Sequence, residues 1–409
     1  MRIVHSMPTL RLADGGVVRA VMDLCGGLAA DGRDVTLITC DDTDAPPSWK
    51  SGVPGVPKVI KVARPSLPGG FFNGAQMREL EGHLRGAGVL HLHAMWTTSN
   101  PQIAKAAGRL GVPYVLSVHG MLDDWCMEQK KLKKAVYMAL LARSMLNNAA
   151  CIHCTAEFEL AQARKHFDAS RVRGEVIPLV FDLSAFRNAP GPAIARAKFN
   201  LPDDGVPTLL FLSRIHVKKG VDVLLRAAAE LVKRGVNFRL AIAGTGDGAY
   251  EQEMKSLAAS LGLQGDRARF LGLVTGDEKV SLYQAADVLL IPTSQENFGF
   301  VFVESLAAGT PLVTTKGVDT WPELEASGGA TIIGRDPAEW ASTVERLVKD
   351  RAALRESGRR GREWALANLD SARTLARFME MYERAAGATG SAGRSLGVGE
   401  AGAPGKHGA

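Results

Sequence analysis

The chain has 409 residues, of which 46% are hydrophobic, and a formal net charge of +6. This length exceeds what one hydrophobic core usually holds, so it favours two domains. No segment approaches the roughly 20 apolar residues that span a bilayer, and the first residues lack a signal-peptide pattern. Five cysteines, an odd number at low density, are typical of a reducing compartment, so we expect a cytoplasmic protein.

Strands and helices alternate through the first half of the chain, a pattern that indicates a parallel sheet. Gly15 and Gly16 form a turn after the first strand, and a helix over 17–32 follows them. The predicted strands are residues 2–6, 34–40, 88–93, 114–120 and 149–155.

One predicted helix accounts for the basic surplus of the first half. Residues 1–185 hold 21 Lys and Arg against 17 Asp and Glu, and residues 128–146 alone hold five against one. The helix mixes lysines with leucines, a composition suited to an anionic membrane surface. The alternative is a solvated first turn followed by a helix that packs on the core. Nucleic acid is not expected as a partner, because basic and aromatic residues do not interleave elsewhere.

The second half repeats the alternation after a loop at 177–186. Its predicted strands are residues 208–214, 237–244, 268–272, 287–292 and 311–315, and its predicted helices are residues 220–234, 250–261 and 277–286. Two Rossmann-like, doubly wound α/β domains that face each other across a cleft explain both halves.

These halves predict the domain organisation. We expect an N-terminal domain over 1–186 and a C-terminal domain over 187–370. A helix over about 371–385 is expected to pack back on the N-terminal domain. The Gly- and Ala-rich residues 386–409 cannot bury enough apolar surface to order themselves, so we expect a disordered tail.

The stretch SRIHVKKG at 213–220 follows a predicted strand and opens a helix. Backbone N–H groups at such a turn, together with the helix N-terminus, attract anions. Arg214 and Lys219 add two positive charges, and charge-assisted hydrogen bonds contribute about 1.5–3 kcal/mol each. The pair therefore suits a diphosphate, both as a ligand and as a leaving group. The alternative is a solvated basic turn.

Two further glycine turns follow strands. Gly15 and Gly16 leave room for a phosphate or a sugar near the backbone, although such turns also carry glycine for geometry alone. The stretch AGTGDG at 243–248 lacks the full dinucleotide fingerprint, so only a tight turn with close backbone approach is expected there.

Three histidines stand at strand ends of the first domain. His91 and His93 alternate along one strand and share a face, and His119 ends another strand beside a glycine. We expect all three to line a polar cleft, with His119 as the strongest candidate for a site residue. The run CIHC at 151–154 matches no standard zinc spacing and indicates a buried strand.

Two glutamates lie around the start of one predicted helix. Glu296 is in the loop after the strand at 287–292, and Glu304 is on the first turns of the helix. Open α/β sheets hold ligands at this edge. A pair of carboxylates often indicates acid and base catalysis, but an ionised carboxylate also accepts two hydroxyl hydrogen bonds.

The ordered set of motifs resembles the retaining glycosyltransferases of family 4, which have the GT-B arrangement of two Rossmann-like domains. The matching motifs are Gly15-Gly16, HLHAMW, HGM, SRIHVKKG, AGTG and the two glutamates that flank FG. The resemblance implies transfer of a sugar from a nucleotide-diphosphate donor with retention of the anomeric configuration. No cofactor and no metal ion are implied, because the basic pair takes the place of the divalent cation of other transferases.

The resemblance implies a role for each charged residue. Arg214 and Lys219 hold the diphosphate, and His119 helps to position the donor sugar. Glu296 contacts the sugar hydroxyls, and Glu304 binds the ribose hydroxyls.

The resemblance also places the backbone amides near Phe298, Gly299 and Phe300 at the sugar and phosphate. The family carries a glycine pair before a further glutamate, which here is Glu323. Residues 316–324 lack that pair, so Glu323 is not supported as a site residue.

Front-side substitution is the expected mechanism, with the departing phosphate taking the proton of the acceptor. Double displacement needs a second carboxylate about 5 Å from the first, and none is evident at the implied sugar site. The stretch HGMLDDWCMEQKKLKKAVY resembles transferases of bacterial surface polysaccharide, which implies a glycan or lipid-linked glycan acceptor at the inner face of the cell membrane. A GT-B nucleotide-sugar epimerase and a non-catalytic nucleotide-sugar-binding protein are the alternatives.

Overall fold

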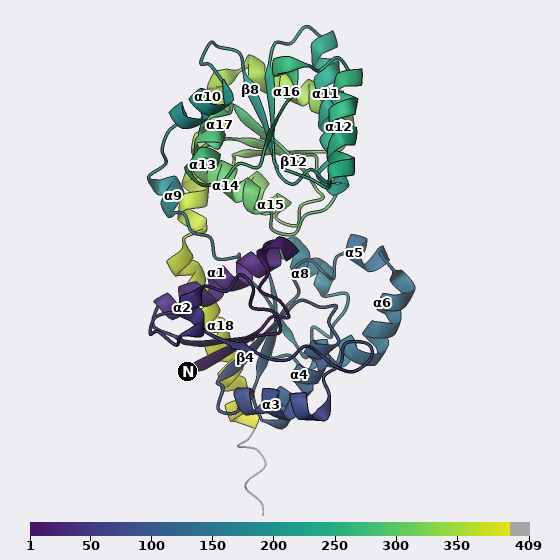
Figure 1. The fold of residues 1–409 in the computed structure, drawn as a ribbon, viewed down its shortest axis with the longest axis vertical. Helices are drawn as coiled ribbons and strands as arrows, with labels where there is room; N and C mark the ends of the chain where they lie inside the picture. The colour runs from purple at the N-terminus through teal and green to yellow at the C-terminus, as the bar shows by residue number, and fades with distance from the viewer. Residues whose placement is uncertain (393–409) are drawn as a thin grey trace, which may run out of the picture.

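The computed structural model describes residues 1–392 and forms two lobes (Figure 1). Each lobe is a parallel sheet with helices on both faces. The first sheet has seven strands in the order β3-β2-β1-β4-β5-β6-β7, and the second has six in the order β10-β9-β8-β11-β12-β13. Strand order reverses direction between β1 and β4 and between β8 and β11, which is the doubly wound pattern. The predicted pair of Rossmann-like α/β sheets is confirmed.

The first sheet consists of β1 (Arg2–Ser6), β2 (Asp34–Thr39), β3 (Lys58–Lys61), β4 (Val89–His93), β5 (Tyr114–Ser117), β6 (Cys151–Cys154) and β7 (Arg173–Val176). The second consists of β8 (Thr208–Leu212), β9 (Arg239–Ala243), β10 (Arg269–Gly272), β11 (Val288–Leu290), β12 (Leu312–Thr315) and β13 (Ala330–Ile333). The run CIHC is the buried strand β6, as predicted.

Strands β3, β7 and β13 are missing from the sequence prediction, and all three lie at the edges of their sheets. None of their residues is fully buried. A central parallel strand is buried on both faces and shows a continuous apolar run, whereas a half-exposed edge strand does not.

Helices cover both sheets. In the first lobe these are α1 (Gly16–Ala30), α2 (Pro47–Lys50), α3 (Gly74–Leu84), α4 (Ser99–Arg109), α5 (Asp124–Glu128), α6 (Lys131–Tyr137), α7 (Arg143–Asn147) and α8 (Glu157–Ala163). In the second they are α9 (Ser184–Arg187), α10 (Ala193–Phe199), α11 (Val221–Lys233), α12 (Gly248–Ser260), α13 (Gly276–Ala285), α14 (Phe300–Ala308), α15 (Trp321–Ala326), α16 (Pro337–Lys349) and α17 (Arg351–Asn368). Short turns are η1 (Leu12–Asp14), η3 (Val217–Lys219) and η4 (Gly265–Arg267).

The last helix, α18 (Ser371–Ala392), returns from the second lobe to the first and contacts α1, β4 and β5 (Figure 1). Its Phe378 and Tyr382 are buried in the core of the first lobe. Residues 386–392 belong to this helix, although the sequence predicts that they are part of a disordered tail. The remainder of that predicted tail, residues 393–409, lies outside the described residues.

The chain crosses between the two cores within a few residues after β7. Ile177 and Val180 pack in the core of the first lobe. Phe181 and Leu183 pack in the core of the second. The crossing loop is therefore held at both ends by buried apolar side chains.

The basic segment 128–146 begins with a break. Lys130 has a left-handed φ of 52° between α5 and α6. From Lys131 the chain is helical through α6, a π-helical turn η2 (Met138–Ala142) and α7. Figure 1 shows α6 at the outer edge of the first lobe. Within the described part of the chain, no helix has the length and apolar character needed to cross a membrane.

Candidate active site

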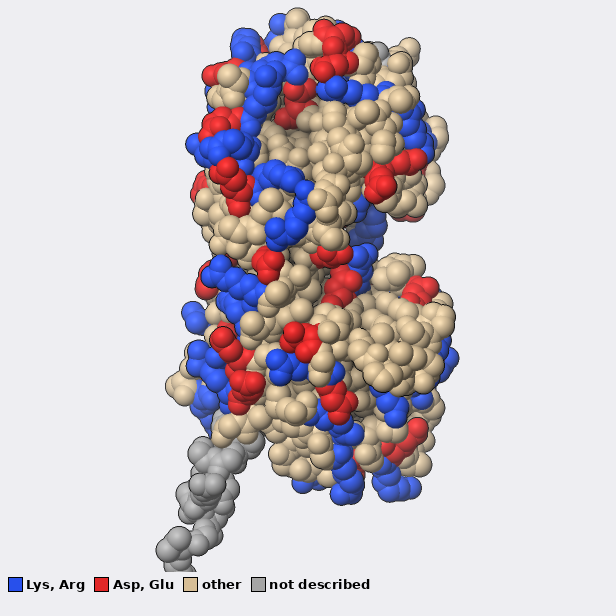
Figure 2. Space-filling view, turned by 90° about the vertical axis from the view of Figure 1, so that its left-hand side faces the viewer, with Lys and Arg blue, Asp and Glu red and all other residues tan. Residues whose placement is uncertain are grey.

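A cleft of about 500 Å³ lies where the carboxyl ends of the two sheets meet. Figure 2 shows the surface hollowed between the lobes. The lining loops follow strands next to both points where strand order reverses, which is where α/β sheets bind ligands. The predicted site residues that line the cleft are Gly16, His119, Arg214, Lys219, Glu296, Phe298, Gly299 and Phe300. Gly15 and Glu304 do not line it.

The basic loop after β8 brings one buried and one exposed cation to the cleft. Its last residue, Gly220, has a φ of 74°, and a Cβ there would collide with the backbone oxygen of Pro292, so this turn requires glycine. Lys219 is buried, and its Nζ forms an ion pair with Glu296. Arg214 is exposed and has no ion-pair partner among residues 1–392. The loop therefore presents a free guanidinium beside a paired ammonium group.

The charge of Lys219 depends on its neighbours. Burial lowers the pKa of Lys219, and the nearby Arg214 and Lys218 cations lower it further. The Glu296 carboxylate opposes this shift, because an adjacent negative charge stabilises the ammonium form. An anion beside Lys219 therefore stabilises its positive charge, and in this structure Glu296 provides it.

The glycine loop after β9 packs directly against the basic loop. A Cβ at Gly244, where φ is 129°, would collide with the backbone of Ser213, and one at Gly246 would collide with Ile215. The backbone N–H of Ile215 donates to the carbonyl of Thr245 at 2.9 Å. The predicted tight turn with close backbone approach is confirmed.

The loop after β11 aims a helix N-terminus at the cleft. Gly299 adopts a φ of 69° and caps α14, where a Cβ would come within 2.5 Å of the Phe302 ring. The backbone of Glu296 is held by the carbonyl of Gly317 at 2.8 Å and by the N–H of Asp319 at 2.9 Å. The first residues of α14 line the same cleft as Arg214 and Lys219, and the free amides and dipole of a helix N-terminus favour an anion there.

Glu304 lies one turn further along α14 and is engaged with α13. Its Oε1 is 2.6 Å from Nζ of Lys279, and its Oε2 accepts a hydrogen bond from the hydroxyl of Tyr283 at 2.9 Å. The side chain is buried and does not line the cleft. Each carboxylate oxygen has a second acceptor position, so ribose binding by Glu304 stays a prediction.

The turn after β1 brings a second helix N-terminus to the cleft. Gly15 has a φ of 120°, and no atom lies within 4 Å of a Cβ built there. Gly16 begins α1 and lines the cleft together with Val17. The space beside Gly15 leaves room for a ligand atom close to the backbone.

His119 reaches the cleft from the first lobe. Its φ of 52° is uncommon for a residue other than glycine, and such strained positions gather at functional sites. Its Nε2 is 3.2 Å from Nδ1 of His93. Burial lowers the pKa of His119 to about 3, so the ring is neutral near pH 7.

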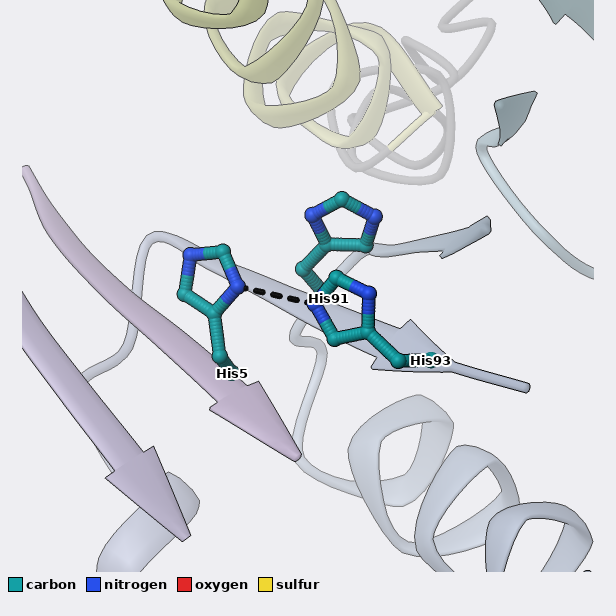
Figure 3. A group of neighbouring side chains, drawn as sticks. All are labelled: His5, His91 and His93. Atoms are coloured by element: carbon teal, nitrogen blue, oxygen red, sulfur yellow. Dashed lines mark hydrogen bonds between the residues drawn. The ribbon is translucent and has the colours of Figure 1, made fainter. Parts of the chain in front are cut away.

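His91 and His93 do not line the cleft, and the prediction that they do is wrong. Both are buried beneath it, because the sheet packs against α18: the two nitrogens of His91 bond to the hydroxyls of Tyr382 and Ser117, each at 2.7 Å. One nitrogen each of His5, His91 and His93 lies within 4.8 Å of the others, close enough to hold a metal ion (Figure 3). His5 and His93 already bond to each other at 3.0 Å. Five of the six ring nitrogens of these histidines have hydrogen-bond partners, which favours a hydrogen-bonded layer over a metal site.

Contacts between the lobes next to the cleft involve residues that the sequence analysis does not single out. Gln295 donates to the carboxylate of Asp123 at 2.8 Å, and Nζ of Lys218 lies 3.8 Å from the ring centre of Trp125. Asn297 packs against the α-carbon of Gly120 so closely that a Cβ there would come within 2.8 Å. No local pattern marks these residues, because each partner lies in the other lobe.

Two families match the chain in succession. The glycosyl transferase 4-like domain matches residues 15–179, and glycosyl transferases group 1 matches residues 194–364. The D-inositol 3-phosphate glycosyltransferase of Mycolicibacterium smegmatis is 30% identical over 405 residues, covering 93% of this chain and 90% of the relative. The D-inositol 3-phosphate glycosyltransferase of Frankia alni is 30% identical over 357 residues, which cover 82% of this chain and 86% of the relative.

Solved structures share the fold. The sucrose-phosphate synthase of Thermosynechococcus elongatus superposes with a TM-score of 0.73 at 21% identity, covering 95% of this chain and 100% of that one. Anabaena HepE in complex with UDP superposes with a TM-score of 0.75 at 18% identity, covering 94% and 100%. The predicted GT-B arrangement is thereby confirmed. The chain belongs to the family 4 glycosyltransferases, GT-B enzymes that use nucleotide-sugar donors.

Proposed function

We propose that this enzyme transfers a hexose, with retention, from a nucleotide-diphosphate sugar to a glycan or lipid-linked glycan of a bacterial surface polysaccharide. The observation that carries the proposal is the convergence of Arg214, Lys219, Glu296 and the N-terminus of α14 in one cleft. Two cations and a helix dipole favour a diphosphate, and the adjacent carboxylate favours hydroxyl groups.

Donor binding changes the partner of Lys219 in this proposal. The diphosphate takes the place of Glu296 as the anion beside Lys219, and it also pairs with the free Arg214. Glu296 is then released to accept hydrogen bonds from the hydroxyls of the donor sugar. The site therefore couples occupation by phosphate to preparation of the sugar subsite.

The transfer step needs no further charged group. The bond between the anomeric carbon and the diphosphate oxygen breaks, and its electron pair leaves with the diphosphate. The acceptor oxygen bonds to the anomeric carbon on the same face, and its proton passes to the departing phosphate oxygen. Arg214 and Lys219 stabilise the charge that develops on the leaving group.

Nucleotide-sugar binding and transfer by variants test this site. UDP- and GDP-sugars are first compared by thermal shift, since a ligand at 100 times its Kd adds about 2.7 kcal/mol to stability. With the donor so identified, Arg214→Ala is expected to weaken nucleotide binding and Glu296→Ala to abolish transfer while nucleotide alone still binds. Lys233→Ala, at an exposed position on α11, is the control. Wild-type turnover by both site variants would refute the assignment.

The outer face of α6 and η2 supports a membrane-bound acceptor. Leu132, Val136 and Leu140, spaced four residues apart, are 83%, 54% and 74% exposed. The opposite face is fixed to the lobe, since the hydroxyl of Tyr137 donates to backbone carbonyls and Nζ of Lys134 contacts the carbonyl oxygen of Cys126.

Exposed lysines flank this apolar stripe, namely Lys130, Lys131 and Lys133. An apolar stripe between cations suits an interface rich in anionic lipid. The opposite side of the molecule, drawn in Figure 2, instead mixes acidic and basic side chains. We therefore extend the proposal to peripheral binding at the inner face of the cell membrane through residues 128–146.

Vesicle sedimentation tests the membrane surface. The wild-type chain is expected to sediment with vesicles of phosphatidylglycerol and phosphatidylcholine, to sediment less at high salt, and to stay in solution with phosphatidylcholine alone. Leu132→Ser/Leu140→Ser should lose this binding, whereas Leu67→Ser, at a residue 48% exposed elsewhere on the lobe, should keep it. Equal sedimentation of both variants would show that residues 128–146 are not the surface that binds the membrane.

A second candidate acceptor comes from the relatives, which are named for D-inositol 3-phosphate. Assays with the identified donor separate the two. Transfer to inositol 3-phosphate in solution, unaffected by Leu132→Ser/Leu140→Ser, would favour the soluble acceptor. Transfer only to lipid-linked glycan on vesicles would favour the polysaccharide role.

A further inference from the structure

Three buried histidines form a chain that ends at the cleft. Nδ1 of His5 lies 3.0 Å from Nε2 of His93, the contact dashed in Figure 3, and Nδ1 of His93 lies 3.2 Å from Nε2 of His119. His5 and His93 come from the adjacent strands β1 and β4, and His119 follows β5. The exposed fractions of the three side chains are 0%, 1% and 8%.

All three rings are neutral near pH 7. Burial lowers the pKa of His5 and of His119 to about 3, and it lowers the pKa of His93 well below its ordinary value. A neutral imidazole carries one N–H and one bare nitrogen. Both hydrogen bonds then form in only two ways: every ring carries its proton on Nδ1, or every ring carries it on Nε2.

His5, at the end of this hydrogen-bonded series that lies away from the cleft, distinguishes these two arrangements. Nε2 of His5 is buried and has no hydrogen-bond partner within the described residues. If the proton were on Nε2 of every ring, this end would hold a buried N–H without an acceptor. If it is on Nδ1, the same position holds only a bare acceptor nitrogen. Unpaired buried N–H groups are rarer in proteins than under-satisfied acceptors.

We propose that His5 and His93 are positioning residues that fix His119 as its Nδ1–H tautomer, so that His119 donates a hydrogen bond to an oxygen atom of the bound nucleotide sugar. Nδ1 of His119 has no partner among residues 1–392 and is not one of their buried unpaired nitrogens. It is therefore the nitrogen left open toward the cleft that His119 lines. The ligand role rests on the proposed function, whereas the tautomer does not.

A second hydrogen-bonded chain in the same layer shows how such a direction is set. Nε2 of His153 lies 2.8 Å from the carbonyl oxygen of Ile177, which can only accept, so the proton of His153 is on Nε2. Ser117 then donates to Nδ1 of His153 and accepts from Nε2 of His91. Tyr382 donates to the remaining nitrogen of His91. Both ends of this series of hydrogen bonds lie inside the lobe. The series through His93 instead ends at the cleft.

Nitrogen NMR of the full chain labelled with ¹⁵N-histidine tests the tautomer without any ligand. Spectra near pH 7, assigned with single His→Asn variants, should show His5, His93 and His119 all protonated on Nδ1. This is the less common tautomer of free histidine. An Nε2–H tautomer or a cationic ring at His119 would overturn the proposal.

Two substitutions at one position test the positioning role. The side-chain N–H of His93→Asn lies where Nδ1 was and can still donate to His119, whereas His93→Leu cannot. These variants are assayed with the donor identified by thermal shift. In His93→Leu, kcat/KM should fall about tenfold, which corresponds to about 1.4 kcal/mol in activation free energy. In His93→Asn, kcat/KM should stay within about threefold of the wild-type value. Melting temperatures show that each variant is folded at the assay temperature.

Equal activity of the two folded variants, whether retained or lost, would refute positioning through this hydrogen bond. Failure of the proposed function gives a different result: the wild-type chain would transfer no sugar from any donor, while the Nδ1–H signals would still be present. The two hypotheses therefore fail separately.

Discussion

The second lobe places charges at the cleft, whereas the first lobe places a neutral imidazole there. Arg214, Lys219 and Glu296 stand on loops that directly follow β8 and β11. His119 instead depends on a buried layer assembled from β1, β4 and β5. A glycine turn is enough to bring a charged group on a loop to the cleft. A neutral imidazole also needs hydrogen-bond partners that fix its orientation and its tautomer. The comparison predicts larger catalytic losses in the second lobe and larger stability losses in the buried layer of the first.

Replacement of the buried ammonium group should have the largest effect. Lys219→Met removes a charge that faces the developing negative charge of the leaving group, so kcat/KM should fall about 10²–10³-fold. Steady-state kinetics with the identified donor measures this loss, and Lys233→Met, at the exposed C-terminal end of α11, serves as control. A loss smaller than that of His93→Leu would reverse the comparison between the lobes.

Removal of one hydroxyl from the buried layer should cost stability and leave catalysis unchanged. Tyr382→Phe leaves Nδ1 of His91 without its donor, so the free energy of unfolding should fall by about 1–3 kcal/mol. Urea denaturation measures it. Tyr250→Phe is a matched control, because the hydroxyl of Tyr250 is buried without a partner among the described residues and should cost little. Equal destabilisation by both changes would contradict the network.

The carboxyl group of Asp319, at the contact between the lobes, predicts an effect on stability that depends on pH. Burial raises the pKa of Asp319 to about 8, and the negative charges of Glu159, Asp123 and Glu323 raise it as well. A hydrogen bond from Asn297 acts in the opposite direction and lowers the pKa. The folded state therefore binds a proton that the unfolded state releases above about pH 4. Stability should fall as pH rises from about 4 to about 8, by at most about 1.4 kcal/mol per pH unit.

Asp319→Asn removes this titration and keeps an oxygen that can accept from Asn297. The unfolding free energy of the wild-type chain, measured between pH 5 and 8 relative to the variant, should decline as pH increases. A parallel pH dependence of the two proteins would show that Asp319 has an ordinary pKa.

Local patterns predicted most of the site because its geometry is local. The turn at Gly220 and the cap at Gly299 each adopt a positive φ within a strand–loop–helix unit, so spacing alone places Arg214, Lys219 and Glu296 at one sheet edge. The prediction for His91 was wrong because strand alternation gives the face of a side chain and not what covers that face. Here α18, far away in sequence, covers it with Tyr382.

The sequence by itself determined the alternating strands and helices, the glycine turns and the positions of the charged groups relative to those turns. These features follow from steric and periodic constraints among residues that are close in the chain. Only the tertiary structure decided that Lys219 pairs with Glu296, that Glu304 contacts α13, and that one histidine of the buried layer reaches the cleft. Each of these depends on contacts between side chains far apart in sequence, where packing and burial select the partners.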